Sequence, residues 1–168
     1  MTCPLPYVTD TNIWIDLHHG RLVAQLFELH YKFVAPDVII AELDEPPGHF
    51  LLSLGLQQCS LSGEQVAQVE SLAKKYRGPS PKDLFALVLA KDLKAILLTG
   101  DRLLCKAAEA EGVTVHGTLW ILDMLITRRI ILPREAAAAL RKMLSSGSRL
   151  PEQECQARLK RWERSKGG

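Results

Sequence analysis

Two acidic residues directly follow apolar segments of strand length. Asp10 comes after residues 7–9, and Asp101 comes after residues 96–100. In an open parallel sheet, loops and helix N-termini converge beyond the carboxyl ends of the strands, and ligands bind there. Either acid alone could be a solvated or capping residue, so the other acids of the chain decide whether they belong to a site.

Two further acids fall on the apolar faces of predicted helices. Glu42 is three residues after Ile39, and Asp83 is four residues before Leu87. Residues at these spacings share one helix face, so we expect both carboxylates to face the core. A buried carboxylate must be paired or bind a metal, because otherwise its pKa shifts and it becomes neutral.

The four carboxylates come from four separate elements, and no His or Cys accompanies them. Such an oxygen-rich set suits Mg²⁺ or Mn²⁺ rather than zinc. Carboxylate-bound Mg²⁺ keeps positions for water and substrate phosphates, which metal-assisted hydrolysis of phosphodiester bonds requires. We therefore interpret the set as the site of a nuclease. Ion pairs of Lys82 with Asp83 and of Arg102 with Asp101 are the structural alternative.

The elements that must position these acids alternate between short apolar segments and longer helical patterns. The predicted strands cover residues 7–9, 33–35, 56–61, 95–99 and 113–116. The predicted helices cover residues 13–17, 21–30, a short segment from Asp37 that stops at Pro46, 62–76, 80–91, 102–111, 118–129, 133–144 and 151–164. This alternation favours βα units around a parallel sheet, so the predicted fold class is α/β.

The composition is that of a globular protein with one sizeable core, since 47% of the 168 residues are hydrophobic and 24% are charged. No apolar stretch approaches the roughly 18 residues of a membrane span. The N-terminus lacks the features of a secretory signal, so we expect a cytoplasmic protein. We expect free thiols and no zinc site, because no C-x-x-C pair occurs among the four cysteines Cys3, Cys59, Cys105 and Cys155.

The charge is unevenly distributed along the chain. Residues 141–168 carry eight basic and three acidic side chains, a net +5, which leaves −3 for the rest of a chain whose total is +2. Gly147 and the serines around it form a predicted linker, so we divide the chain into a body, residues 1–147, and a basic helical tail, residues 148–168. A basic tail permits contact with nucleic acid, although it can equally be a solvated helix face.

Four short sequence blocks surround the four acids. They are residues 7–15 (YVTDTNIWI), 38–43 (VIIAEL), 80–84 (SPKDL) and 97–104 (LLTGDRLL). Together, and in this order, they resemble the PIN-domain ribonucleases, including the small prokaryotic kind to which VapC-like toxins belong. The resemblance covers about residues 7–125. It implies a three-layer α/β/α fold with a central parallel sheet, here with a helical C-terminal extension.

The resemblance also implies the roles of individual residues. The acidic pocket of the family falls on Asp10, Glu42, Asp83 and Asp101. One Mg²⁺ or Mn²⁺ would be held by Asp10, Asp83 and Asp101, while Glu42 would bind it through water or help to deprotonate the attacking water. The polar neighbours that would orient ligands or contact substrate are Asn12, Thr99 and Arg102.

The implied activity is hydrolysis of RNA, preferably single-stranded, that leaves a 5′-phosphate and a 3′-hydroxyl. Many relatives carry a further acid shortly after the position of Asp101, where Arg102 and Leu103 stand here. The choice between one and two metal ions therefore stays open. Implied partners are an inhibitory antitoxin and a second copy of the chain.

Two other functions compete with this interpretation. A haloacid-dehalogenase-type phosphatase also starts with an Asp after its first strand, but it needs D-x-D where Asp10 is followed by Thr11 and Asn12, and a later acid where Cys105 stands. The other alternative is a PIN-fold nucleic-acid-binding or regulatory protein with weak or no catalysis.

The C-terminal helices suggest an assembly. We expect a homodimer, because the predicted helices provide more apolar surface than one small sheet needs, as in Leu119, Leu122, Leu125 and Ile126. The alternative is a monomer in which the last helices fold back over the body.

Overall fold

The computed structural model describes residues 4–164, and Cys3 and Lys166 lie outside the described part of the chain. Within it, a parallel sheet of five strands has the order β3-β2-β1-β4-β5. The strands are β1 (Tyr7–Thr9), β2 (Phe33–Pro36), β3 (Gln57–Cys59), β4 (Ile96–Leu98) and β5 (Val115–His116). β1 lies at the centre and pairs with β2 and β4. The predicted α/β class with a parallel sheet is confirmed.

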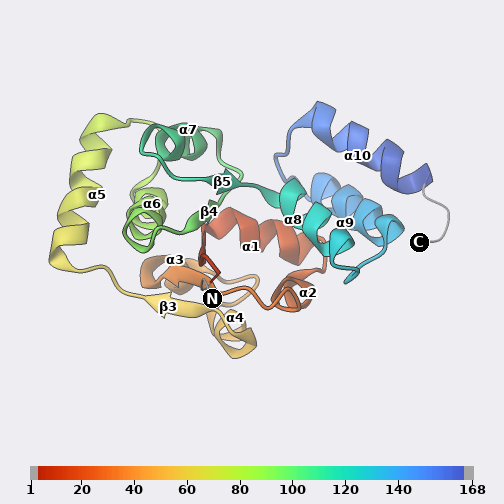
Figure 1. Ribbon diagram of the computed structural model, residues 1–168, viewed down its shortest axis with the longest axis horizontal. Helices are drawn as coiled ribbons and strands as arrows, with labels where there is room; N and C mark the ends of the chain where they lie inside the picture. The colour runs from red at the N-terminus through yellow and green to blue at the C-terminus, as the bar shows by residue number, and fades with distance from the viewer. Residues whose placement is uncertain (1–3, 165–168) are drawn as a thin grey trace.

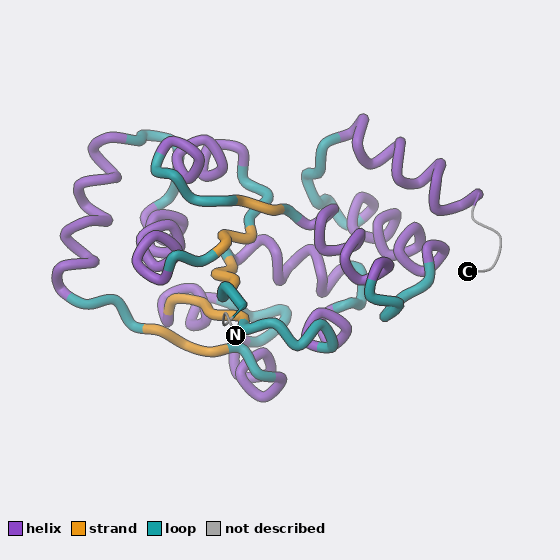
Figure 2. Tube along the Cα trace, in the orientation of Figure 1, coloured by secondary structure: helices purple, strands orange, loops and turns teal. Residues whose placement is uncertain are grey.

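Helices cover the sheet from both sides (Figure 1). They are α1 (Thr11–His19), α2 (Val23–Phe27), α3 (Asp37–Glu42), α4 (Gly48–Leu54), α5 (Gly63–Lys75), α6 (Pro81–Leu93), α7 (Arg102–Ala110), α8 (Thr118–Thr127), α9 (Pro133–Ser145) and α10 (Glu152–Arg164). α5, α6 and α7 lie on one side of the strands, and α1, α8, α9 and α10 lie on the other. Figure 2 shows the strands between these two groups of helices, which is the expected three-layer arrangement.

Polar caps begin the helices that follow the strand ends. Asp10 is the N-cap of α1 and Asp101 is the N-cap of α7, and each side chain accepts a hydrogen bond from the backbone three residues later. Ser80 caps α6 in a capping box with Asp83, and Pro81 occupies its first turn. These residues satisfy N–H groups that the first helical turn leaves unpaired. Three of the four candidate acids therefore lie at helix starts.

The core is continuous on both faces of the sheet. Val8 and Leu97 are fully buried in the central strands, and nearly all of α6 between Leu84 and Ala90 is buried against them. Trp14 of α1 has no exposed surface, and its indole Nε1 donates to Thr9 Oγ1 at 2.8 Å. The indole therefore fixes α1 against the end of β1, where Asp10 stands.

α1 and α9 approach each other very closely. Gly20 ends α1, and a Cβ atom at this position would lie 2.6 Å from Met143 Cε and 3.3 Å from Ala139 Cβ. A side chain at this position would require the end of the Met143 side chain to move and Ala139 to shift by a few tenths of an ångström, so glycine favours this close packing.

Several predicted elements differ from the observed ones. Residues 48–54 form α4, which no pattern predicted, because Phe50 and Leu52 are exposed and the run of apolar residues shows no helical period. α2 is shorter than predicted, since Arg21 and His30 adopt left-handed backbone conformations with φ of 57° that end the helix on both sides.

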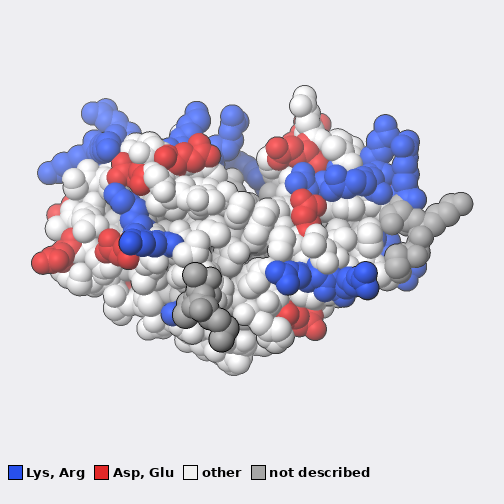
Figure 3. All heavy atoms as spheres, in the orientation of Figure 1, with Lys and Arg blue, Asp and Glu red and all other residues white. Residues whose placement is uncertain are grey.

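The C-terminal helix packs on the body. Cys155, Leu159 and Trp162 of α10 are buried, and α10 lies along α9. Arg158 binds both carboxylate oxygens of Asp123 in α8, the shortest contact being 2.7 Å. Lys and Arg side chains gather at this end of the molecule (Figure 3). The tail is thus docked, and the boundary at residue 147 stays a prediction.

Three of the four apolar residues expected to form a dimer surface, Leu119, Leu122 and Leu125, are buried by the protein's own helices, and Ile126 is half-buried. The three leucines therefore do not supply a dimer surface, and the homodimer stays a prediction. Cys59, Cys105 and Cys155 are free, as predicted. No helix of the described residues is long and apolar enough to span a membrane.

Candidate functional site

Thr99 joins the two acids that follow the strand ends. Asp10 is 1% exposed; its Oδ1 accepts from the backbone N–H of Ile13 at 3.0 Å, and its Oδ2 accepts from the Thr99 hydroxyl. The same Thr99 oxygen accepts from the backbone N–H of Asp101 at 3.1 Å. The structure therefore brings Asp10, Thr99 and Asp101 together, because β1 and β4 are neighbours in the sheet.

The environment of Asp10 disfavours its charge. Burial raises the pKa of Asp10, the hydrogen bonds from Thr99 and Ile13 lower it, and the negative charges of Asp83 and Asp16 raise it, with a net pKa of about 7. A carboxyl group with this pKa is about half protonated at neutral pH. A cation bound beside it would restore the ionised form.

Asp83 and Asp101 each use one carboxylate oxygen for the cap of their own helix. Asp83 Oδ2 accepts from Ser80 N at 3.0 Å, and Asp101 Oδ1 accepts from Leu104 N at 2.8 Å. Within residues 4–164 the other oxygen of each carboxylate has no hydrogen-bond partner. These two oxygens are therefore available to a ligand.

Glu42 does not face the core as predicted. It is the last residue of α3, its side chain is 30% exposed, and its carboxylate binds the Thr11 hydroxyl and the Lys82 ammonium. Burial alone would raise its pKa, but the hydrogen bonds from Lys82 and Thr11 and the charge of Lys82 lower the pKa of Glu42. α3 contains both Ile39 and Glu42, as predicted, but Glu42 is its last residue and turns toward Lys82 and Thr11 instead of the core.

Neither predicted ion pair forms in the described part of the chain. Lys82 binds Glu42 instead of Asp83, and Arg102 makes no salt bridge with Asp101. Through its hydrogen bond with Thr11, however, Glu42 is tied to the residue that directly follows Asp10. The position of Glu42 beside the start of α1 therefore comes from its contact with Thr11, and not from an apolar helix face.

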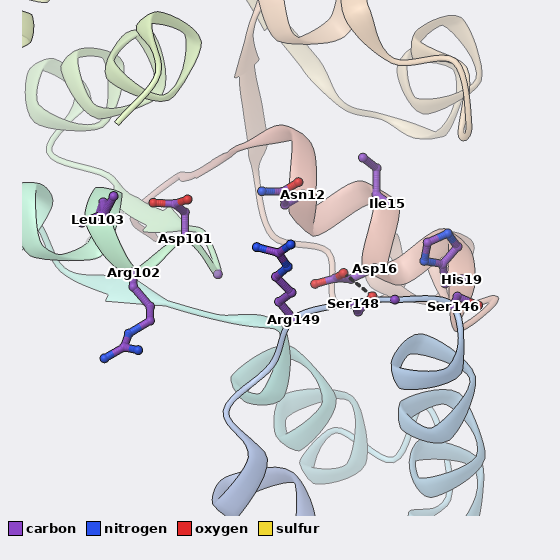
Figure 4. Close-up of a pocket in the computed structure, with 12 residues that line it drawn as sticks. Asn12, Ile15, Asp16, His19, Asp101, Arg102, Leu103, Ser146, Ser148 and Arg149 are labelled. Carbon is purple, nitrogen blue, oxygen red and sulfur yellow. Dashed lines mark hydrogen bonds between the residues drawn. The ribbon is translucent and has the colours of Figure 1, made fainter. Parts of the chain in front are cut away.

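A cavity of about 570 Å³ is lined by Asn12, Asp101 and Arg102, among other residues. Of the four candidate acids, Asp101 is in this lining, and Asp10, Glu42 and Asp83 are not. In Figure 4 the side chains of Asn12 and Asp101 lie at its upper edge, whereas Arg102 points away from Asn12. The role of Arg102 in substrate binding stays a prediction.

Other residues of the cavity were not predicted. Asp16 is 8% exposed and accepts from the hydroxyls of Thr118 at 2.8 Å and Ser148 at 2.6 Å. His19 and Arg149 line the same cavity. Asp16 could have been found, because it follows Asn12 by four residues and so shares its helix face. Arg149 lies in an irregular linker, which offers no periodic signal.

The candidate acids do not surround a single point. Among residues 4–164, no three His, Cys, Asp or Glu side chains are grouped so that they could hold a metal ion. Asp83 and Asp101 are turned toward their helix caps, and Glu42 toward Lys82. The donor chemistry nevertheless fits Mg²⁺ or Mn²⁺, because the donors are hard carboxylate oxygens and the buried Asp10 contacts no cationic side chain among the described residues.

Comparisons with known proteins place the chain in a wider context. The family model DUF3368, described as a PIN domain, matches residues 6–164. Among solved structures, a PilT N-terminus domain protein, SSO1118, from the hyperthermophilic archaeon Sulfolobus solfataricus P2 is similar. It is 14% identical with a TM-score of 0.48, and the match covers 73% of this chain and 94% of that one. No curated protein matches the chain.

Proposed function

This chain belongs to the PIN-domain family, and from that premise we propose that it is a Mg²⁺- or Mn²⁺-dependent endoribonuclease. The observation that carries the proposal is the state of Asp10, a buried carboxyl group whose pKa is raised to about 7 beside Asp83 and Asp16. A purely structural capping residue has no need of this environment. A carboxyl group with a strongly perturbed pKa, joined through Thr99 to an acid that lines the cavity, Asp101, is typical of a functional site.

The acids have distinct tasks in this proposal. Asp10, Asp83 and Asp101 would hold the cation, which would polarise the scissile phosphate and lower the pKa of the attacking water. Thr99 keeps the carboxyl group of Asp10 oriented through its hydroxyl and ties it to the backbone of Asp101. Asn12, exposed at the cavity, orients water or substrate.

Glu42 acts better as an orienting group than as a base. The hydrogen bonds from Lys82 and Thr11 lower its pKa, and a carboxylate with a lowered pKa is a weaker proton acceptor. We therefore assign to Glu42 a water-mediated contact with the cation, and not the deprotonation of the nucleophile. Lys82 then both restrains Glu42 and places a positive charge near the substrate.

The decisive experiment measures cleavage of a mixed single-stranded RNA pool by the full chain. Cleavage should appear with Mg²⁺ or Mn²⁺, disappear with EDTA, and leave 5′-phosphate ends. Equal cleavage by wild type and Asp10→Asn would show that the activity does not come from this site. Absence of cleavage with either metal would contradict the proposal.

A PIN-fold RNA-binding or regulatory protein is the second candidate. The ion pair of Glu42 with Lys82 and the absence of a grouped metal site within residues 4–164 favour it. It predicts RNA binding without turnover in the same assay. Membership of the PIN-domain family argues against the phosphatase alternative. An antitoxin that covers the acidic cavity stays a prediction of the family resemblance.

A further inference from the structure

The linker between α9 and α10 forms a wall of the acidic cavity. Residues 146–149 line it opposite Asn12 and Asp101, although they are more than 130 residues away from Asn12 along the chain (Figure 4). The linker follows the last turn of α9, where the backbone N–H of Ser148 donates to Met143 O at 3.0 Å. Gly147 has φ of 97°, a left-handed conformation that favours glycine.

A buried carboxylate fixes this linker to the body. Asp16 of α1 accepts from the Ser148 hydroxyl with one oxygen and from the Thr118 hydroxyl of α8 with the other. Three separate parts of the chain thus meet at one side chain that is 8% exposed. The hydrogen bond with Asp16 fixes Ser148, and it therefore also restrains the backbone that carries Arg149.

That next residue is Arg149, whose side chain enters the cavity. Its guanidinium lies between Asn12 and Asp16 in Figure 4, and Asp101 lines the same cavity. Arg149 is exposed and forms no salt bridge with any described residue. A guanidinium offers a planar fork of donors that matches phosphate oxygens.

We propose that Arg149 binds a backbone phosphate of single-stranded RNA next to the scissile bond, and that the contact between Asp16 and Ser148 positions it. This inference rests on the proposed nuclease function, because it assigns a substrate contact to the same cavity. Arg149 is the substrate-binding residue, and Ser148 and Asp16 are positioning residues.

Binding is measured apart from cleavage, in an Asp10→Asn background where RNA remains intact. Fluorescence anisotropy with a short labelled single-stranded RNA should show about tenfold weaker binding for Arg149→Ala. The slope of log affinity against log salt should decrease by about 0.7, the value for one phosphate contact on a single strand. Arg149→Lys should keep the salt slope and recover part of the affinity.

Arg134 provides a matched control. It is exposed at the other end of α9, about 18 Å from the linker at 1.5 Å per helical residue. Arg134→Ala removes the same charge and should leave both affinity and slope close to those of the parent. Equal losses in the two variants would mean a general charge effect and would overturn the inference.

The positioning role of Ser148 is tested by steady-state kinetics of RNA cleavage. In the otherwise wild-type chain, Ser148→Ala should raise KM several-fold with little change in kcat, and Ser148→Thr, which keeps the hydroxyl, should restore KM. Thermal unfolding confirms that each variant is folded. An unchanged KM in a folded Ser148→Ala protein would overturn the positioning role.

The outcomes separate the two proposals. If the wild type cleaves RNA and Arg149→Ala leaves affinity and salt slope unchanged, the inference is wrong and the nuclease stands. If the wild type binds RNA without cleaving it and Arg149→Ala weakens binding, the phosphate contact stands and the nuclease fails. If the wild type does not bind RNA at all, both fail.

Discussion

Asp10 and Glu111 both have carboxyl groups with little exposure to solvent, but their neighbours carry opposite charges. Glu111, which follows α7, has a side chain that is 9% exposed and contacts Lys75 Nζ at 2.9 Å, Lys91 Nζ at 2.8 Å and the Tyr76 hydroxyl at 2.5 Å. The hydrogen bond from Lys75 and then those from Lys91 and Tyr76 lower the pKa of Glu111 to about 2. The pKa of Asp10, by contrast, is raised to about 7.

The comparison separates an acid whose charge is compensated within the protein from the acid that we propose to be functional. The partners of Glu111 come from α5 and α6, so its charge is compensated within the protein and ties three helices together. Asp10 has other acids nearby and only neutral hydrogen-bond donors. Low exposure alone therefore does not indicate function; a missing counter-charge does.

The largest expected effect is on catalysis. Asp10→Asn should reduce metal-dependent RNA cleavage by at least about a hundredfold, because losing a direct ligand should exceed the 10–100-fold loss typical of residues behind the ligands. Circular dichroism should show an unchanged fold, since Asn also caps helices. Asp92→Asn, at an exposed position of α6, is the control and should retain activity. Retained cleavage in Asp10→Asn would show that Asp10 is not needed for activity.

The second effect is on stability as a function of pH without metal. The folded state binds a proton at Asp10 with pKa about 7 and the unfolded state with an ordinary pKa of 3.8. The stabilisation is therefore complete below about pH 4 and is lost as pH rises through 7. Relative to Asp10→Asn, the wild type should lose a few kcal/mol of unfolding free energy between about pH 4 and 8.

Urea unfolding in EDTA across this pH range measures the difference. Parallel stability curves for the two proteins would mean that Asp10 is ionised normally. Glu111 gives the opposite sign, because its stabilisation is present above about pH 4.5 and is lost as pH falls through 2.

A smaller effect is expected from the metal itself. Free Mg²⁺ or Mn²⁺ at ten times its Kd should stabilise the fold by about 1.4 kcal/mol, which raises Tm by about 3–6 °C for a chain of this size. The rise should be absent in Asp10→Asn, reduced in Asp101→Asn and intact in Glu111→Gln. A Tm that does not respond to millimolar metal would argue against a cation site.

The smallest effect concerns the structural acid. Glu111→Gln should lower the unfolding free energy by about 1 kcal/mol at neutral pH, a modest value because Lys75 and Lys91 remain solvated. Thermal unfolding should show a Tm lower by about 2–4 °C, with RNA cleavage unchanged. Loss of cleavage without loss of stability would mean that Glu111 is not merely structural.

Sequence patterns predicted the fold better than the site. Strands with continuous apolar residues, such as 96–98, and helices with Ser80 or Asp101 as caps carry local signals of structure. They sufficed for the parallel sheet and for the convergence of Asp10 with Asp101. Glu42 shows the limit, because its position depends on where α3 ends and on a contact with Lys82, 40 residues away.

The linker residues show a second limit. Nothing local marks Ser148 or Arg149, since their importance comes from a contact with Asp16, 132 residues earlier in the chain. Such tertiary contacts leave no periodic trace in the sequence. Asp16 itself has a usable signal in its spacing from Asn12, but only when the cavity is known.

The close contact at Gly20 has a consequence for how the cavity can adapt. Because α1 and α9 pack closely at Gly20, the helix that carries Asp16 lies directly against the helix that leads to the linker. The turn between β4 and α7 forms the other side of the cavity. Gly100 in this turn is exposed, and no neighbouring atom lies within 4 Å of the position that a Cβ would take. We therefore expect that sequence changes which alter the width of the cavity, and with it the RNA strand that can enter, occur in this turn and not in the linker.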